Sequence, residues 1–164
     1  MFFFGKMSNN RGLLSSKKMS SEWSPVETTS YQDHVIAHVR GATALGYFEF
    51  DQAAHILLDI GFFWTIFVDG EMALVLQSLA IREFELAEEV RTALFADVQS
   101  LHDGLYDNKS LLRMKLAPTG ALIKEVGIYA LDDNRRILIE CEKTNLVIES
   151  SLSTGEMQII PVLT

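Results

Sequence analysis

The stretch that decides the fold runs from Ala121 to Val162 and reads ALIKEVGIYALDDNRRILIECEKTNLVIESSLSTGEMQIIPV. Apolar residues, many of them β-branched, alternate with polar ones along four segments, which is typical of strands with one face toward a core. Short polar connections separate these segments, and connections of this kind join antiparallel neighbours. We therefore expect four consecutive antiparallel strands, at 121–131, 135–142, 146–151 and 157–162.

A long amphipathic helix is expected immediately upstream of this region, from Ser78 to His102. Its apolar residues recur at helical spacing and form one stripe, which is the pattern of a helix that packs on a sheet. Gly104 follows and is suited to the left-handed residue that ends many helices. A further short strand is expected at 111–116.

The first half of the chain gives a less regular pattern. His34 to Val39 alternates and is rich in β-branched residues, and Tyr47 to Phe50 is short and aromatic, so both are predicted to be strands. Asp51 is a good N-cap for a helix that would end at Ile60, before Gly61.

Two more strands are expected around a hairpin. Phe62 to Val68 is apolar on both alternating faces, which predicts a central strand covered on both sides. Asp69-Gly70 is a strong hairpin signal, and the chain returns through 71–76. The predicted fold class is thus α+β, mostly antiparallel, in the order β-β-α-β-β-α followed by a meander of four or five strands.

The first 30 residues lack any periodic pattern and are predicted to be a flexible leader before a single domain at 31–164. Residues 1–18 carry four basic residues and no acidic one. Met1, Met7 and Met19 are alternative starts, and the text after Met19 resembles an ordinary N-terminus, so the preceding residues are a candidate mis-called extension.

Composition and charge exclude several classes of function. The 164-residue chain is 48% hydrophobic and has a formal net charge of -8, so it is expected to fold as a soluble domain that repels nucleic acid phosphates. No stretch has the 18 or so apolar residues typical of a membrane helix. The single cysteine, Cys141, rules out an intramolecular disulfide and fits a cytoplasmic location.

The sharpest pattern for a metal site is Asp51, His55 and Asp59, spaced by four residues on the predicted helix. Residues at this spacing share one helix face, and carboxylate and imidazole groups are ligands for zinc, iron or manganese. The same face lies opposite the apolar stripe, so a solvated polar face explains the pattern more simply. No metal or other cofactor is therefore assigned.

The other chemistry-bearing residues are predicted to be structural. His34 and His38 would lie about 13 Å apart in a strand, too far to chelate one ion. Cys141 shares a strand face with Ile137 and Ile139, so it should be buried. The adjacent Glu140 and Glu142 disfavour a thiolate, so its reactivity should be low. The aromatic residues at positions 47, 48, 50, 62, 63, 64 and 67 favour a core, and an apolar pocket or interface is the alternative.

Two functions follow from these observations. The preferred one is a non-catalytic binding or assembly module that associates with itself or another protein, through a sheet edge or an aromatic surface. The alternative is a small-molecule-binding or metal-assisted enzyme that uses His55, His38 or His34 with nearby carboxylates. No nucleic acid or membrane partner is expected, and a pocket that holds two of these histidines would favour the enzyme.

Overall fold

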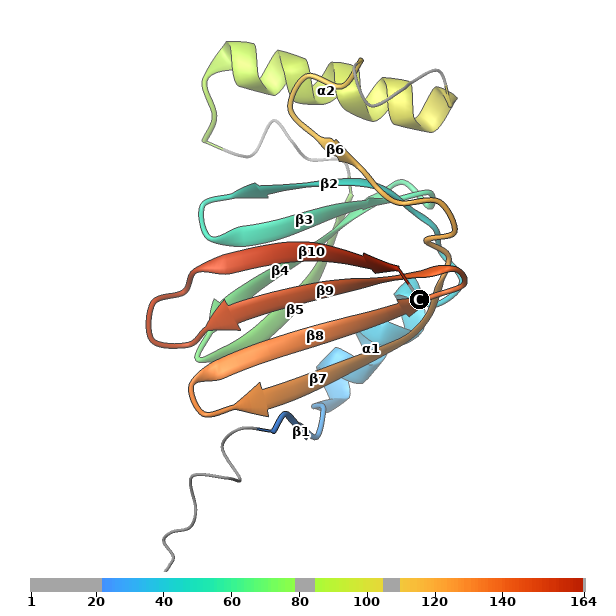
Figure 1. Cartoon of the computed structure of the whole chain (residues 1–164). Helices are drawn as coiled ribbons and strands as arrows, with labels where there is room; N and C mark the ends of the chain where they lie inside the picture. The colour runs from blue at the N-terminus through green and yellow to red at the C-terminus, as the bar shows by residue number, and fades with distance from the viewer. Residues whose placement is uncertain (1–21, 79–84, 105–109, 164) are drawn as a thin grey trace, which may run out of the picture.

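The computed structural model describes residues 22–78, 85–104 and 110–163 and shows two antiparallel sheets with two helices (Figure 1). The predicted α+β, mostly antiparallel fold class is confirmed. The first half contains α1 (Ser30–Val39), β2 (Ala44–Phe50), β3 (Ala53–Leu58), β4 (Phe62–Asp69) and β5 (Glu71–Ser78), preceded by β1 (Ser24–Pro25). The second half contains α2 (Glu88–Asp103), β6 (Lys115–Leu116), β7 (Ile123–Leu131), β8 (Asn134–Cys141), β9 (Thr144–Ser151) and β10 (Met157–Leu163).

Each sheet is built around a four-strand meander. The first sheet has the order β5-β4-β3-β2-β6, and the second has the order β1-β7-β8-β9-β10. The four strands predicted between Ala121 and Val162 are the meander of the second sheet, with β7, β8, β9 and β10 paired consecutively. The predicted leader ended at residue 30, but β1 within it pairs with β7. Residues 1–21 lie outside the described residues.

The main core lies between the two sheets. Trp64 and Ile56 of the first sheet and Ile137 and Ile148 of the second are all fully buried there. Helix α1 closes one side of this sandwich, where it contacts β5 and β7, and β10 lies next to β2 and β3 on the other side. The second core lies on the opposite face of the first sheet, where Leu57 and Phe63 pack against α2. The first sheet is therefore covered on both faces.

The segment predicted as a strand at His34–Val39 is wrong, because it forms most of α1. Thr29 caps this helix, and Gln32 completes a capping box by accepting the backbone N–H of Thr29. Gln32 also donates to the backbone carbonyl of Met72 at 2.8 Å, which ties α1 to β5. The caps and the burial of one face outweigh the β preference of the branched residues.

The helix predicted from Asp51 to Ile60 is also wrong. Asp51 and Gln52 form a turn, and the following residues form β3, whose six side chains are all buried. A strand that is covered on both faces is apolar without alternation, so its sequence resembles a buried helix. The sequence pattern alone therefore could not separate the two structures.

The remaining elements follow the predictions with shorter bounds. Strand β4 is central, as expected, and the hairpin to β5 turns at Gly70, whose φ is 74°. Helix α2 begins at Glu88 rather than Ser78 and ends at Gly104, which has the expected left-handed conformation. Residues 79–84 lie outside the described residues. The strand expected at 111–116 is reduced to the two residues of β6.

A buried carboxylate fastens α2 to the segment that leads into β6. Asp97, on α2, is 1% exposed and accepts the backbone N–H groups of three consecutive residues at 2.7–2.8 Å. These residues are Leu112, Arg113 and Met114. Since hydrogen bonds to an ionised acceptor are stronger than neutral ones, Asp97 holds α2 in place on the first sheet.

Neither helix in the described residues is long and apolar enough to cross a membrane.

The free edge of β10 is poorly suited to pairing with another strand. Ile159 donates its backbone N–H to Oε2 of Glu49 at 2.9 Å, so this N–H points away from β9. Donors of alternate residues point the same way, and the next outward position is Pro161, which has no N–H. Two successive outward positions therefore offer no free donor, which is a common protection for edge strands.

Candidate functional site

The turn between β2 and β3 adopts an uncommon backbone conformation. Asp51 and Gln52 have φ angles of 54° and 58°, in the left-handed region that residues other than glycine rarely occupy. Gln52 Nε2 donates to the backbone carbonyl of Thr154 at 3.3 Å, so the turn is tied to the connection between β9 and β10. Two cavities lie beside this turn, and both are lined by residues 50–53.

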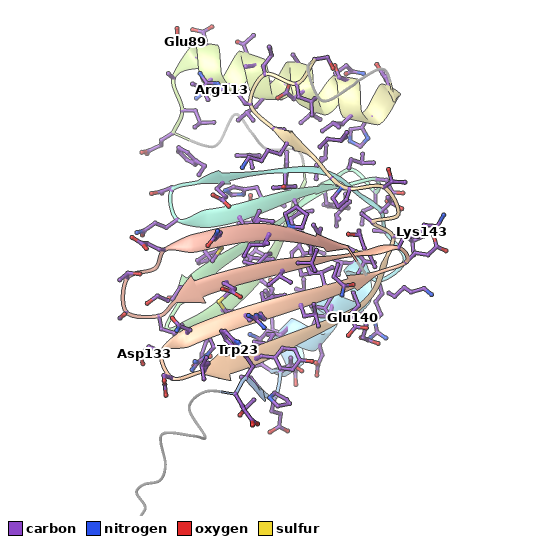
Figure 2. All side chains as sticks on the ribbon, in the orientation of Figure 1. Trp23, Glu89, Arg113, Asp133, Glu140 and Lys143 are labelled. Carbon is purple, nitrogen blue, oxygen red and sulfur yellow. The ribbon has the colours of Figure 1, made fainter. Side chains whose placement is uncertain are left out.

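The first cavity has a volume of about 650 Å³ and lies where the turn meets the second sheet. Its walls come from the segment before β1, the ends of β2 and β3, and the residues around the β9–β10 connection. They are Trp23, Glu49, Phe50, Asp51, Gln52, Ala53, Asn134, Glu149, Ser150, Ser151, Glu156, Met157 and Gln158. Figure 2 shows Trp23 over the strands of the second sheet.

The first cavity is acidic. Four of the residues that line it are carboxylates, and none of its described lining residues is basic. Arg136 lies behind one wall, where its guanidinium bonds Glu149 through Nε at 2.9 Å and Nη2 at 2.5 Å. The same guanidinium lies 4.2 Å from the centre of the Trp23 ring. Arg136 therefore pairs with Glu149 and contacts Trp23, while no ion pair within the described residues involves Asp51 or Glu156.

The second cavity has a volume of about 620 Å³ and lies on the face of the first sheet that α2 covers. It is lined by Phe50, Asp51, Gln52, Ala53, His55, Phe67, Val68, Glu85 and Gly155. Three aromatic or aliphatic side chains of β2 and β4 contribute to its walls, namely Phe50, Phe67 and Val68. Its chemistry-bearing group is His55.

His55 is buried and uncharged at neutral pH. Its Nδ1 lies 3.0 Å from Oγ1 of Thr65, and its ring stacks on Phe48 with 4.8 Å between centroids. Burial lowers the pKa of His55 to about 4, although a hydrogen bond with the backbone of Phe50 acts in the opposite direction. The imidazole is therefore held as a neutral hydrogen-bonding group in the cavity wall.

The structure does not bring the predicted metal ligands together. Asp51 is in the turn, His55 points into the α2 side of β3, and Asp59 lies beyond the other end of that strand. Asp59 Oδ1 accepts the backbone N–H of Thr43 at 2.9 Å, which is a structural role. In a strand, residues four positions apart are separated by about 13 Å. The three residues therefore do not share one face, as they would on a helix.

The two histidines of α1 lie closer together than expected. Because His34 and His38 are on a helix and not a strand, they occupy one face, with 4.8 Å between their ring centroids. His38 Nδ1 lies 3.2 Å from the backbone oxygen of His34, and both side chains are exposed. Within the ranges the structure describes, no group of three or more His, Cys, Asp or Glu side chains is arranged to hold a metal ion.

The remaining predicted residues are mostly structural. Cys141 is buried in the sandwich, where burial raises the pKa of its thiol to about 11. Of the aromatic group, Phe63 and Trp64 are core residues, while Phe62 is 37% exposed. Tyr47 belongs to the core between the two sheets. Burial, with a smaller contribution from Glu49, raises the pKa of Tyr47.

Sequence reasoning missed the acidic cavity because its residues come from distant parts of the chain. Trp23 precedes β1, Glu49 is the residue before the last one of β2, and Glu156 precedes β10. No local spacing connects them, since the sandwich topology alone brings them to one end of the molecule. The available signals were the net negative charge and a tryptophan in a segment otherwise predicted to be a leader.

Comparison with protein-family models, curated proteins and solved structures finds no match. The function of the chain must therefore be inferred from its own cavities, charges and surfaces.

Proposed function

We propose that this chain is a non-catalytic binding module, and that the acidic cavity beside the β2–β3 turn binds a cationic group of its ligand. The observation that carries the proposal is the cavity of about 650 Å³ with four carboxylates and no basic residue among its described lining residues. Carboxylates that line a concave surface focus the electric field and attract cations.

Three further features support binding at this place. Trp23 provides an aromatic wall, which suits the contact of a cation or an aliphatic chain with a ring. Glu49 and Arg136 are already engaged with Ile159 and Glu149, so the walls are held in position before a ligand arrives. The turn at Asp51 and Gln52 is strained, and such strain is frequent at binding sites.

The proposal places the module in the cytoplasm, where a lone reduced cysteine such as Cys141 is stable. Its partner is a protein or a small molecule and not a nucleic acid, since the net charge of -8 repels phosphates. Self-association stays a prediction. The protected edge of β10 favours contact through side-chain surfaces over strand pairing.

Binding of short charged peptides tests the proposal. Tetralysine titrated into the full chain at low salt should bind, with an affinity that falls as salt is raised, and tetraglutamate should not. The double variant Asp51→Asn, Glu156→Gln should weaken tetralysine binding about tenfold, which corresponds to roughly 1.4 kcal/mol.

A matched control separates the cavity from the overall charge. The double variant Glu89→Gln, Glu142→Gln also removes two negative charges, at exposed positions that do not line the cavity. It should bind tetralysine nearly as well as the parent chain. Equal weakening by both double variants, or no binding of tetralysine at low salt, would contradict the proposal.

The alternative function, a small-molecule-binding enzyme, has one observation in its favour. His55 borders the second cavity, which Asp51 and Glu85 also line. The other two candidates, His34 and His38, do not line either cavity. A neutral imidazole could accept or donate a hydrogen bond to a small ligand there. Ligand-detected NMR with imidazole-binding fragments, on the parent chain and on His55→Gln, tests this alternative.

A further inference from the structure

The outward face of the second sheet carries a continuous apolar row. Side chains alternate between the two faces of a strand, and Ile137, Ile139 and Ile148 point into the sandwich. Their neighbours therefore point outward. In register across the sheet, the outward residues Gly127, Leu138, Val147 and Ile160 are successive partners on β7, β8, β9 and β10.

No described element covers this row. Helix α2 packs on the other sheet, and α1 lies at the side of the sandwich, so the outward face of the second sheet faces the viewer in Figure 1. Leu138, Val147 and Ile160 are only half-buried, and Val162 at the end of the same face is 41% exposed. Apolar side chains gathered on one open face are typical of an interaction surface.

This apolar face is continuous with the acidic cavity. Glu149 and Gln158 are partners in the next row of the same face, and both also line the cavity. Trp23 belongs to both as well, because it packs on the outward side chain of Arg136. A ligand that enters the cavity can therefore continue across the outward face without leaving the surface.

The charges around the apolar row identify the kind of partner. On one side of it lie Glu125 and Glu140, which are direct partners between β7 and β8, and Arg40 lies 3.9 Å from Glu125, so Glu140 contributes the negative charge on this side. On the other side, Arg136 is already paired with Glu149, and the acidic cavity follows. A second copy of this chain would bring like charges to this surface, since its net charge is -8. A partner that carries both apolar and basic side chains complements it.

From these observations we infer that the ligand is a polypeptide segment with basic residues at one end, followed by apolar ones. Its basic residues bind the acidic cavity and its apolar residues lie on Leu138, Val147 and Ile160. An extended segment suits the surface, because its alternate side chains point to one face and repeat at about 7 Å, as the rows of a sheet do, so apolar residues at every second position can lie on the apolar row. This inference rests on the proposed function, since it takes the acidic cavity as one end of the binding surface.

Three ten-residue peptides test the inference on the full chain by isothermal titration. One has five lysines followed by a five-residue segment that alternates leucine with serine, the second has five lysines followed by five serines, and the third has five glutamates followed by the leucine–serine segment. The lysine–leucine peptide should bind at least tenfold more tightly than the lysine–serine peptide, and the glutamate–leucine peptide should not bind. The double variant Leu138→Ser, Val147→Thr should remove the advantage of leucine and leave lysine–serine binding unchanged.

The outcomes separate the inference from the proposed function. Equal binding of the two lysine peptides, or an advantage of leucine that persists in the double variant, would overturn the inference and leave the acidic cavity as a site. Absence of binding by both lysine peptides would overturn the two together. Ile160→Thr is a second outward variant, and circular dichroism verifies that each variant is folded.

Light scattering of the full chain tests a second copy as the occupant. The expected result is the same oligomeric state for the parent chain and for the double variant Leu138→Ser, Val147→Thr. A dimer that this double variant dissociates would assign the face to a second copy and overturn the inference.

Discussion

The two meanders differ in what covers them, although each consists of four consecutive antiparallel strands. The first sheet lies between the second sheet and α2, so both of its faces are buried, while the described residues cover only one face of the second sheet. Their sequences differ accordingly. All six residues of β3 are buried, whereas buried and half-buried residues alternate along β9. The first sheet stabilises the molecule, and the second is free to present a surface.

The largest expected effect comes from the loss of the hydrogen bonds that hold α2 on the first sheet. Asp97→Ala removes the carboxylate that accepts three backbone N–H groups and leaves these donors without their partner. We expect a loss of about 4 kcal/mol in the free energy of unfolding, measured with urea. Asp97→Asn keeps one acceptor and should lose less. A loss below about 1 kcal/mol in the alanine variant would show that α2 is held by its apolar contacts alone.

The same substitution in each sheet measures the difference between them directly. Leu57→Ala in β3 opens a cavity between the first sheet and α2 and should lower the free energy of unfolding by about 3 kcal/mol. Leu138→Ala on the outward face of β8 should lower it by less than about 1 kcal/mol. Denaturant unfolding of the two variants gives the comparison. Similar losses would mean that the outward face is covered in solution.

A third effect, smaller than those of Asp97→Ala and Leu57→Ala, is a pH dependence that belongs to the first sheet. Because the pKa of His55 is lowered to about 4, the unfolded chain binds a proton below pH 6.5 that the folded chain does not. Stability is therefore complete above this pH and falls as the pH decreases toward 4. The expected loss between pH 7.5 and pH 5 is about 2 kcal/mol.

Unfolding of His55→Gln in the same buffers separates this effect from the titration of carboxylates. The variant should lose less stability than the parent chain between pH 7.5 and pH 5. Identical slopes for the two proteins would show that His55 is protonated without penalty, as a solvated histidine is.

The sequence predicted the second sheet well because one open face produces alternation, as in Leu146 to Ser151. The prediction failed for β3 because burial on both faces removes the alternation of apolar and polar residues. Asp51, His55 and Asp59 are spaced by four residues, which is also the spacing of one helix face. The prediction failed for α1 because branched residues concealed the capping pair of Thr29 and Gln32, a signal that was present in the sequence.

The candidate site could not be predicted from the sequence. The apolar and aromatic residues indicated a binding surface, but neither the place of the acidic cavity nor a cationic ligand followed from them. Trp23, Glu49 and Glu156 meet because two hairpin connections and the segment before β1 converge at one end of the sandwich. Tertiary convergence of this kind leaves no spacing in the sequence.

The edge of β10 has a consequence for the behaviour of concentrated solutions. Protein chains that expose an unprotected strand can extend one another's sheets and grow into fibrils. Here the hydrogen bond from the backbone N–H of Ile159 to Glu49, and the missing N–H of Pro161, leave two successive positions of the edge unable to donate to an added strand. The molecule can therefore keep an open apolar face for a partner while its neighbouring strand edge resists polymerisation.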